Sequence, residues 1–490
     1  MKRIIAFIIG IITIVTIVFG LVEEETINYN VNSKDLLYSI DEIKTDYQKV
    51  TNLSKGQENL LCAISRGLVY KDIDGNIVPD LAESYEELDN GIEYRFKLKD
   101  DIYWSDGKKI TSKDICDFFK ELIKYEDKEN IEVLFDVYGV EKYKNSEIYF
   151  NDGVAIRGED DTVIFRLNKP NNNFVDELTK IQYRVKKSLP LWSEINKYYK
   201  DIVFSGYYSI YDYEDTYIRL INNKKNNDIS IVIVEDENEE TAMAAFDVGK
   251  RDIIINPPNN LLEELNKNNE LLSFPSTEGL YLVINTNKND LNLSTRMAIY
   301  KNLCDALREY EKNNNMLFEL SEGSYVLKDK KDLTKLQTRR VSISSGEENI
   351  FIKKLSLCAI DSEDNRTICR YISEWFNNRE IIVNVEYVDK DDLGVLNSKK
   401  YDLYLIDKDS RDSKEILFNE LSTFFNKEER DIYNVERVND DYIRLEENIF
   451  NNVRIVPLLY YKNNIVISNK EYNISLDYYG NMDFSNLNKK

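Results

Sequence analysis

The stretch that decides the fold, residues 67–119, reads GLVYKDIDGNIVPDLAESYEELDNGIEYRFKLKDDIYWSDGKKITSKDICDFF. Its turn pairs Asp74-Gly75 and Asn90-Gly91 are flanked by β-forming residues, which is a strong hairpin signal. Within residues 94–98, apolar side chains alternate with charged ones, the period of a half-buried strand. Thr111 then stands as an N-cap before a helical apolar pattern. We therefore predict a β-rich, turn-punctuated unit that leads into a helix.

The length and composition are those of a globular chain with more than one domain. A length of 490 residues predicts about two to four domains. The formal net charge of −23 disfavours nucleic acid and anionic lipid as partners, because both repel an acidic surface. The chain contains no histidine. This removes Ser-His-Asp and Cys-His nucleophiles and histidine-based zinc, copper or nickel sites, so it counts against an enzyme.

The cysteines form no CxxC pair and mostly have apolar neighbours in the sequence. They are Cys62, Cys116, Cys304, Cys358 and Cys369. We expect buried thiols that act as small hydrophobic side chains. A disulfide in an oxidising compartment is the alternative, although the odd count and the scattered positions do not indicate one.

The N-terminal segment has the pattern of an export signal. Met1–Arg3 is positively charged, Ile4–Val22 carries no charge, and Glu23–Glu25 follows. The uncharged run of about 19 residues would be roughly 28 Å long as a helix, and the flanking charges place the N-terminus in the cytoplasm. Two interpretations stay open. One is a cleaved signal peptide, for which residues 18–20 offer a poor cleavage site; the other is an uncleaved anchor, which the long unbroken run favours.

The second half of the chain carries the pattern of a parallel sheet covered by helices. The segments Lys354–Ile360, Ile381–Tyr387 and Tyr401–Ile406 have the composition of strands. Glu363–Asn377, between the first two, has apolar residues on one helical face. Strands that alternate with helices are typical of β-α-β units, in which the strands run parallel.

Several spaced blocks together resemble one known family. The segments GLVYKDIDGNIVPDLAESYE and YRFKLKDDIYWSDGKKITSKDICDFF, followed by blocks at 204–225, 278–303 and 449–487, keep the motif order of the peptide-type (family 5) extracellular solute-binding proteins of ABC importers. The resemblance covers about residues 27–310 and 350–487, which is nearly all of the chain after the N-terminal segment.

The resemblance implies an α/β fold of the two-lobed periplasmic-binding-protein kind (type II, clamshell) with an extra N-terminal subdomain. It implies a signal peptide or membrane anchor at residues 1–25, lobe I at residues 26–277 and 456–490, and lobe II at residues 278–455. Proteins of this family do no chemistry, because two lobes simply close on a ligand about a hinge. We therefore expect no enzyme activity, no cofactor and no metal.

The function implied is capture of an oligopeptide or similar small solute for the permease subunits of an ABC importer. We expect a monomer that works outside the cytoplasmic membrane and is tethered by its N-terminal helix or released. The alternative function is a membrane-anchored solute sensor or surface interaction protein with a degenerate ligand cleft.

The resemblance also points to ligand-binding positions after the strand Tyr401–Ile406. The family's tryptophan position falls on Lys408 and its amine-holding acid falls on Arg411, with Asp409 and Asp412 close by. A slip of one or two residues lets Asp409 or Asp412 hold the α-amino group of a peptide, since a carboxylate suits an ammonium. The alternative is that the amine site is lost and the run is a solvated charged turn.

Three further candidates come from other blocks. Lys55 lies in the loop Thr51–Gln57, and this loop lies near the ligand backbone in the family. Tyr281 and Asn285 match the family's strand that enters the second lobe. The alternatives are an ordinary solvated loop for Lys55 and a core or rim position for Tyr281.

Overall fold

The structure, a computed structural model, describes most of the chain. The described residues are 35–51, 53–224, 229–286, 291–312, 314–327, 334–344, 352–389, 400–410, 413–439, 441–468, 472 and 474–487. Within these ranges no helix is both long and apolar enough to cross a membrane. The apolar segment Ile4–Val22 lies outside them, so both interpretations of it stay predictions.

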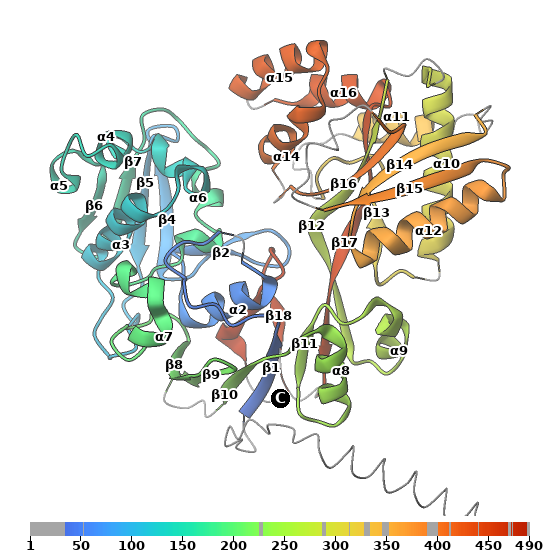
Figure 1. Cartoon of the computed structure of the whole chain (residues 1–490). Coiled ribbons are helices and arrows are strands. Elements are labelled where there is room, and N and C mark those ends of the chain that lie inside the picture. Colours follow the sequence, from blue (N-terminus) through green and yellow to red (C-terminus); the bar gives the residue numbers. More distant parts are fainter. Residues whose placement is uncertain are drawn as a thin grey trace, which may run out of the picture.

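The chain folds into two α/β lobes joined by one continuous sheet, which confirms the predicted two-lobed fold (Figure 1). The strand order is β15-β14-β16-β12-β17-β11-β1-β10-β9-β8, and β13 pairs with β17 beside this path. We call the part with β1–β11, β18 and β19 lobe I, and the part with β13–β16 and helices α10–α16 lobe II. Among the strands of the described residues, β12 and β17 belong to both lobes.

Lobe I is built around three parallel strands, with β1 in the middle. β1 (Asp35–Ile40) runs parallel to β10 (Ser230–Glu235) and to β11 (Ile253–Ile255). Antiparallel strands and short helices complete this part of the lobe: β2 (Val69–Lys71), β3 (Ile77–Pro79), β8 (Tyr208–Tyr213), β9 (Tyr217–Asn222), β18 (Ser475–Leu476), β19 (Met482–Asp483), α2 (Lys55–Ile64), α7 (Ile195–Tyr198), α8 (Glu239–Asp247) and α9 (Leu262–Lys267).

Residues 67–119 supply β4 and β5 of a separate four-stranded sheet attached to lobe I, in the order β4-β5-β7-β6, and β6 and β7 come from residues 156–166. Asn90 and Gly91 both have positive φ, as the hairpin between β4 and β5 requires. The apolar members of residues 94–98 are buried and the charged ones exposed, as predicted. Thr111 accepts a hydrogen bond from the Asp114 amide and so caps α3, which confirms the predicted helix start.

The elements of this subdomain are β4 (Ala82–Leu88), β5 (Glu93–Leu98), β6 (Ile156–Glu159), β7 (Thr162–Arg166), α3 (Ser112–Tyr125), α4 (Val140–Lys144), α5 (Phe150–Gly153) and α6 (Phe174–Glu177). Figure 1 shows them beside the rest of lobe I and on the same side of β12 and β17.

Two long antiparallel strands cross from one lobe to the other. β12 (Leu271–Ile284) and β17 (Ile455–Ile467), here called the hinge strands, pair with each other along most of their length. β17 pairs with lobe I strand β11 at one end, and β12 pairs with lobe II strand β16 at the other. Their register shifts between Pro275 and Gly279. A proline cannot donate to the ladder and a bulge interrupts it, so the ladder is weakest where the lobes meet.

Lobe II confirms the predicted β-α-β pattern. β14 (Lys354–Ile360) runs parallel to both β15 (Ile382–Val388) and β16 (Leu403–Asp409). The helix between β14 and β15 is α12 (Glu363–Asn377), with the predicted bounds. The other elements of this lobe are β13 (Phe318–Leu320), α10 (Leu293–Glu311), α11 (Thr334–Ser344), α14 (Lys414–Leu421), α15 (Lys427–Asn439) and α16 (Ile443–Asn451).

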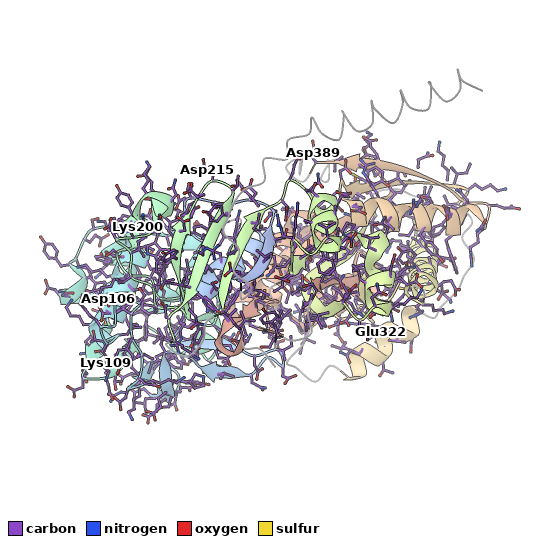
Figure 2. All side chains as sticks on the ribbon, turned by 90° about the horizontal axis from the view of Figure 1, so that it is seen from below. Asp106, Lys109, Lys200, Asp215, Glu322 and Asp389 are labelled. Carbon is purple, nitrogen blue, oxygen red and sulfur yellow. The ribbon has the colours of Figure 1, made fainter. Side chains whose placement is uncertain are left out.

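Each lobe has its own hydrophobic core. One large cluster of buried side chains uses residues 36–253 and 465–487, and the other uses residues 280–461. The cysteines are divided between these cores as free thiols, four of them buried, and burial raises the pKa of the Cys358 thiol to about 11. Charged side chains such as Asp106, Lys109 and Glu322 are exposed on the outside of the lobes (Figure 2). This accords with an acidic chain that stays in solution through its surface charge.

Candidate ligand crevice between the lobes

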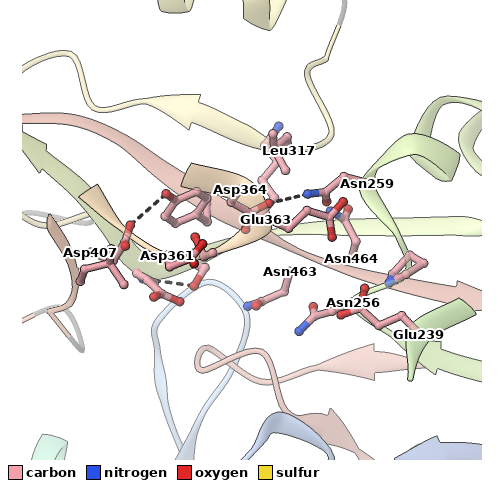
Figure 3. A pocket seen from close by; sticks show the side chains of 17 residues that line it. Glu239, Asn256, Asn259, Leu317, Asp361, Glu363, Asp364, Asp407, Asn463 and Asn464 are labelled. Atoms are coloured by element: carbon pink, nitrogen blue, oxygen red, sulfur yellow. Dashed lines mark hydrogen bonds between the residues drawn. The ribbon is translucent and has the colours of Figure 1, made fainter. Parts of the chain in front are cut away.

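A crevice of about 390 Å³ lies beside the hinge strands and is lined by side chains from both lobes (Figure 3). Lobe I contributes the start of α8 and the segment after β11, lobe II contributes the segment from β14 into α12, and β12 and β17 form the floor. The lining residues are Glu239, Asn256, Pro257, Asn259, Ser276, Glu278, Leu317, Ile360, Asp361, Ser362, Glu363, Asp364, Asp407, Tyr461, Lys462, Asn463 and Asn464.

The lobe II wall is formed where parallel strands end. β14 ends at Ile360, directly before Asp361, and Asp407 lies near the end of β16. The carboxyl ends of parallel strands are the usual place for ligands in α/β sheets. Ser362 caps α12 by accepting from the Asn365 amide, which places the acids that follow it in the first turn of the helix, facing the crevice.

The lining is strongly acidic, with six carboxylates and a single lysine. Two of the carboxylates are held by neighbours in lobe II. Arg366 makes two hydrogen bonds to Asp361, at 2.6 and 2.7 Å. Asp407 accepts from Asn365 at 2.6 Å and from the Tyr461 hydroxyl at 2.9 Å. These two acids are therefore partly neutralised or fixed in place.

A hydrogen bond crosses the crevice between the lobes. Asn259 Nδ2, in the segment after β11, donates to Asp364 Oδ1 in α12 at 2.5 Å. Burial raises the pKa of Asp364, and the hydrogen bond from Asn259 offsets part of that rise. This bond ties the first turn of α12 to lobe I at the edge of the hinge.

Carboxylates from the two lobes also face each other. Burial raises the pKa of Glu239, and the negative charges of Glu363, Glu240 and Asp364 raise it further. Among the described residues, Glu239, Glu363 and Asp364 make no ion pair with a lysine or arginine side chain. Negative charge on one lobe thus stands close to negative charge on the other. In the described part of the chain no group of three or more acidic or thiol side chains is arranged to hold a metal ion.

One buried polar atom in the crevice lacks a hydrogen-bond partner. Asn464, on β17, has 5% of its surface exposed, and its Nδ2 donates to the Met316 carbonyl at 2.9 Å. Its Oδ1 accepts no hydrogen bond from the described residues. A buried acceptor without a donor is costly, so this oxygen marks a place where a ligand donor would be stabilised.

Two of the positions predicted after the strand Tyr401–Ile406, Lys408 and Asp409, lie at the end of β16, next to the crevice residue Asp407. Asp409 is exposed and accepts from Thr277 Oγ1 at 2.7 Å. Lys408 points to the other face of the strand, where its Nζ lies 3.0 Å from the Glu420 carboxylate in α14. Arg411 and Asp412 lie outside the described residues, so their roles stay predictions.

The other predicted site residues do not line this crevice. Lys55 begins α2, and its Nζ donates to Glu58 at 2.5 Å and to the Tyr479 carbonyl at 2.9 Å, so it anchors the C-terminal segment. Tyr281 is fully buried and donates to the Tyr325 carbonyl. Asn285 is also buried and donates to the Tyr401 carbonyl. Each of these three side chains therefore stabilises the interior of its own lobe: Lys55 in lobe I, and Tyr281 and Asn285 in lobe II.

Sequence reasoning did not find the crevice residues. Glu239 and Glu363 come from segments more than a hundred residues apart, and Asn464 is an inward position in the middle of a strand. The available signal was local: acidic residues directly follow the caps of two helices, at Asn238-Glu239 and at Ser362-Glu363. Such acids normally serve the helix itself, so only the fold reveals that the two helix starts share one crevice.

Comparison with known protein families gives a match within the first two thirds of the chain. The model described as bacterial extracellular solute-binding proteins, family 5 (middle part), matches residues 76–300. The oligopeptide-binding protein SarA of Streptococcus gordonii is 27% identical over 143 residues, which cover 28% of this chain and 21% of SarA. The chain thus aligns with about a fifth of the length of that relative.

Solved structures of low sequence identity share the fold over nearly the whole chain. The unliganded open form of MppA, a periplasmic murein tripeptide-binding protein, has a TM-score of 0.66 at 17% identity and covers 90% of this chain and 94% of its own. The substrate-binding protein CtaP of Listeria monocytogenes has a TM-score of 0.65 at 16% identity, with the same coverage. The sequence motifs, the family model over residues 76–300 and the two-lobed fold agree, so this chain is similar to the bacterial extracellular solute-binding proteins of family 5 in that segment and shares a two-lobed binding-protein fold over nearly its whole length.

Proposed function

We propose that the protein captures an oligopeptide or similar small solute between its two lobes and presents it, outside the cytoplasmic membrane, to the permease of an ABC importer. The observation that carries this proposal is the pair of strands, β12 and β17, that runs from one separately cored lobe into the other beside a crevice lined by both. Two rigid bodies joined by two strands close by a hinge motion, and a ligand held between them favours closure.

The weakened ladder between Pro275 and Gly279 supports a hinge at this place. We infer lobe boundaries at residues 277–278 and 455–456, with lobe I at residues 26–277 and 456–490 and lobe II at residues 278–455. The separate cores and the register shift support these boundaries. The protein acts as a monomer and not as an enzyme, and residues 1–25 direct its export or tether it to the membrane.

The proposal is tested by thermal melting of the purified chain with and without an equimolar pool of short peptides. A ligand that binds only the folded state raises the melting midpoint by mass action, by about 2.7 kcal/mol of stability at a hundredfold excess over the dissociation constant. We expect a rise that saturates with pool concentration. A pool of free amino acids at the same total concentration is the control for nonspecific stabilisation.

An unchanged melting midpoint would contradict the proposed capture of peptides. If the midpoint stays unchanged with every peptide pool, the capture proposal is wrong. The alternative, a membrane-anchored sensor or surface interaction protein with a degenerate ligand cleft, would then be the better account of the same fold.

A further inference from the structure

The crevice has a chemical bias that the family fold does not dictate. We propose that it receives a positively charged group of the captured solute, an ammonium or a guanidinium, between Glu239 of lobe I and Glu363 and Asp364 of lobe II. This inference rests on the proposed capture function and names the class of solute that the site prefers, namely peptides with lysine or arginine side chains.

The first reason is the charge of the two walls. Six carboxylates and one lysine line the crevice, and Lys462 is turned to donate to the Asn315 carbonyl at 2.6 Å. Glu239 and Glu363 have no cationic partner among the described residues, and they face each other from different lobes. Both side chains are exposed, but like charges that stand close together repel, so a cation placed between them lowers the energy of the closed arrangement.

The second reason is independent of the carboxylates. Asn464 Oδ1 is a buried acceptor that receives no hydrogen bond from the described residues, and Asn464 lines the same crevice (Figure 3). An ammonium or guanidinium carries several N–H donors and no acceptor. The same group therefore satisfies the amide oxygen and the carboxylates together.

The N-termini of α8 and α12 meet at this crevice, and it is their acidic side chains, not the helix ends themselves, that favour a cation. The N-terminus of a helix by itself favours an anion. At α8 and α12 the first turn already carries acids, which are Glu239 and Glu240 in α8 and Glu363 and Asp364 in α12. The helix ends are thus satisfied within the chain, and the surplus negative charge is what a solute meets.

The planar fork of arginine fits carboxylates that come from different directions, and a lysine ammonium reaches them as a point charge. Asp409 lies two residues after Asp407 in β16, on the same face of the strand. A peptide with its α-amino group near Asp409 could therefore place a cationic side chain in the crevice.

The test uses the full chain and an equimolar pool of random tetrapeptides, with captured peptides identified by mass spectrometry after removal of the free pool. We expect lysine- and arginine-containing peptides to be enriched in the wild-type chain. The paired substitution Glu363→Gln and Asp364→Asn keeps the shape and the acceptor for Asn259, and should lower this enrichment about tenfold, the loss that a charge-assisted hydrogen bond carries.

The control is Glu374→Gln, which removes one negative charge from the exposed C-terminal part of the same helix. Enrichment should persist in that variant. Peptides captured without preference for lysine or arginine would overturn this inference and leave the capture function standing. Capture of no peptide would overturn both. If the paired variant fails to fold, the enrichment of lysine- and arginine-containing peptides by the wild-type chain still tests the inference. A melting midpoint that rises with magnesium chloride but not with spermidine would also overturn it.

Discussion

Removing one buried carboxylate in lobe II should destabilise that lobe selectively. Glu446, in α16, is fully buried, and its Oε2 accepts from Arg340 Nη2 at 2.6 Å. The Lys414 Nζ lies 2.5 Å from Oε1 of the same carboxylate. Glu446 therefore joins α11, α14 and α16, and α14 is the helix that follows β16 and its predicted ligand-binding positions.

The size of the effect follows from what Glu446→Ala leaves behind. Arg340 has a side chain only 3% exposed, and it would lose its counterion while staying buried. Removing one partner of a buried ion pair costs about 3–5 kcal/mol. Arg340 keeps its hydrogen bond to the Gly323 carbonyl and its place 5.3 Å from the Tyr325 ring centre. We therefore expect a loss near the lower end, about 3 kcal/mol.

The assay is unfolding in urea followed by hydrogen–deuterium exchange with peptide resolution. Because the cores of the lobes are separate, peptides from lobe II should lose protection at lower urea concentration while those from lobe I keep their midpoint. Glu447→Ala, one position along the same helix and less buried, is the matched control, with an expected effect within about 0.5 kcal/mol.

Two results would refute this reasoning. A loss of under 1 kcal/mol in Glu446→Ala would mean that the buried ion network does not stabilise lobe II. An equal loss of protection in both lobes would mean that they unfold as one unit, against the inferred boundaries.

Three further changes have defined outcomes. Gly206→Ala places a methyl group against the backbone of Ile64, so the free energy of unfolding measured in urea should fall by about 1–3 kcal/mol. The control Gly249→Ala, with open space around it, should cost only about 1 kcal/mol because of its positive φ. Equal losses in the two variants would contradict the close contact argued for Gly206. Burial lowers the pKa of Lys186 to about 8, so the charged side chain costs most stability below that pH, and the cost disappears as the pH rises through the pKa of lysine in the unfolded chain. The stability gained by Lys186→Met should therefore be about 2 kcal/mol smaller at about pH 9.5 than at about pH 7.5. A gain that does not change with pH would count against the lowered pKa. Asp409→Asn should weaken peptide binding by about 1.5 kcal/mol or more if this carboxylate holds the α-amino group, and isothermal titration that gives the wild-type affinity would remove that role.

Local patterns in the sequence predicted the elements of the fold well. The helix Glu363–Asn377 and the strand Lys354–Ile360 have the predicted bounds, because their apolar residues follow one period without interruption. The cap at Thr111 was readable for the same reason, since the residues that make it are three positions apart. Where one short segment carries the whole signal, sequence reasoning is sufficient.

The candidate site depends on distant contacts, and the sequence could not supply them. Tyr281 and Asn285 were chosen by their place in a motif, but the fold turns both into the interior of lobe II. Glu239 and Glu363 looked like ordinary helix-start acids until the hinge strands brought their helices together. Asn464 gave no local signal, because a polar residue within a strand becomes informative only when its partners are known.

The central claim is that the two lobes close around a ligand. The most direct test is native mass spectrometry of the full chain purified from its own host. A binding protein of this kind should keep a small solute through gentle purification, so we predict a mass above that of the polypeptide, with the excess lost on denaturation. Only the bare polypeptide mass, unchanged after incubation with a peptide pool, would contradict the account.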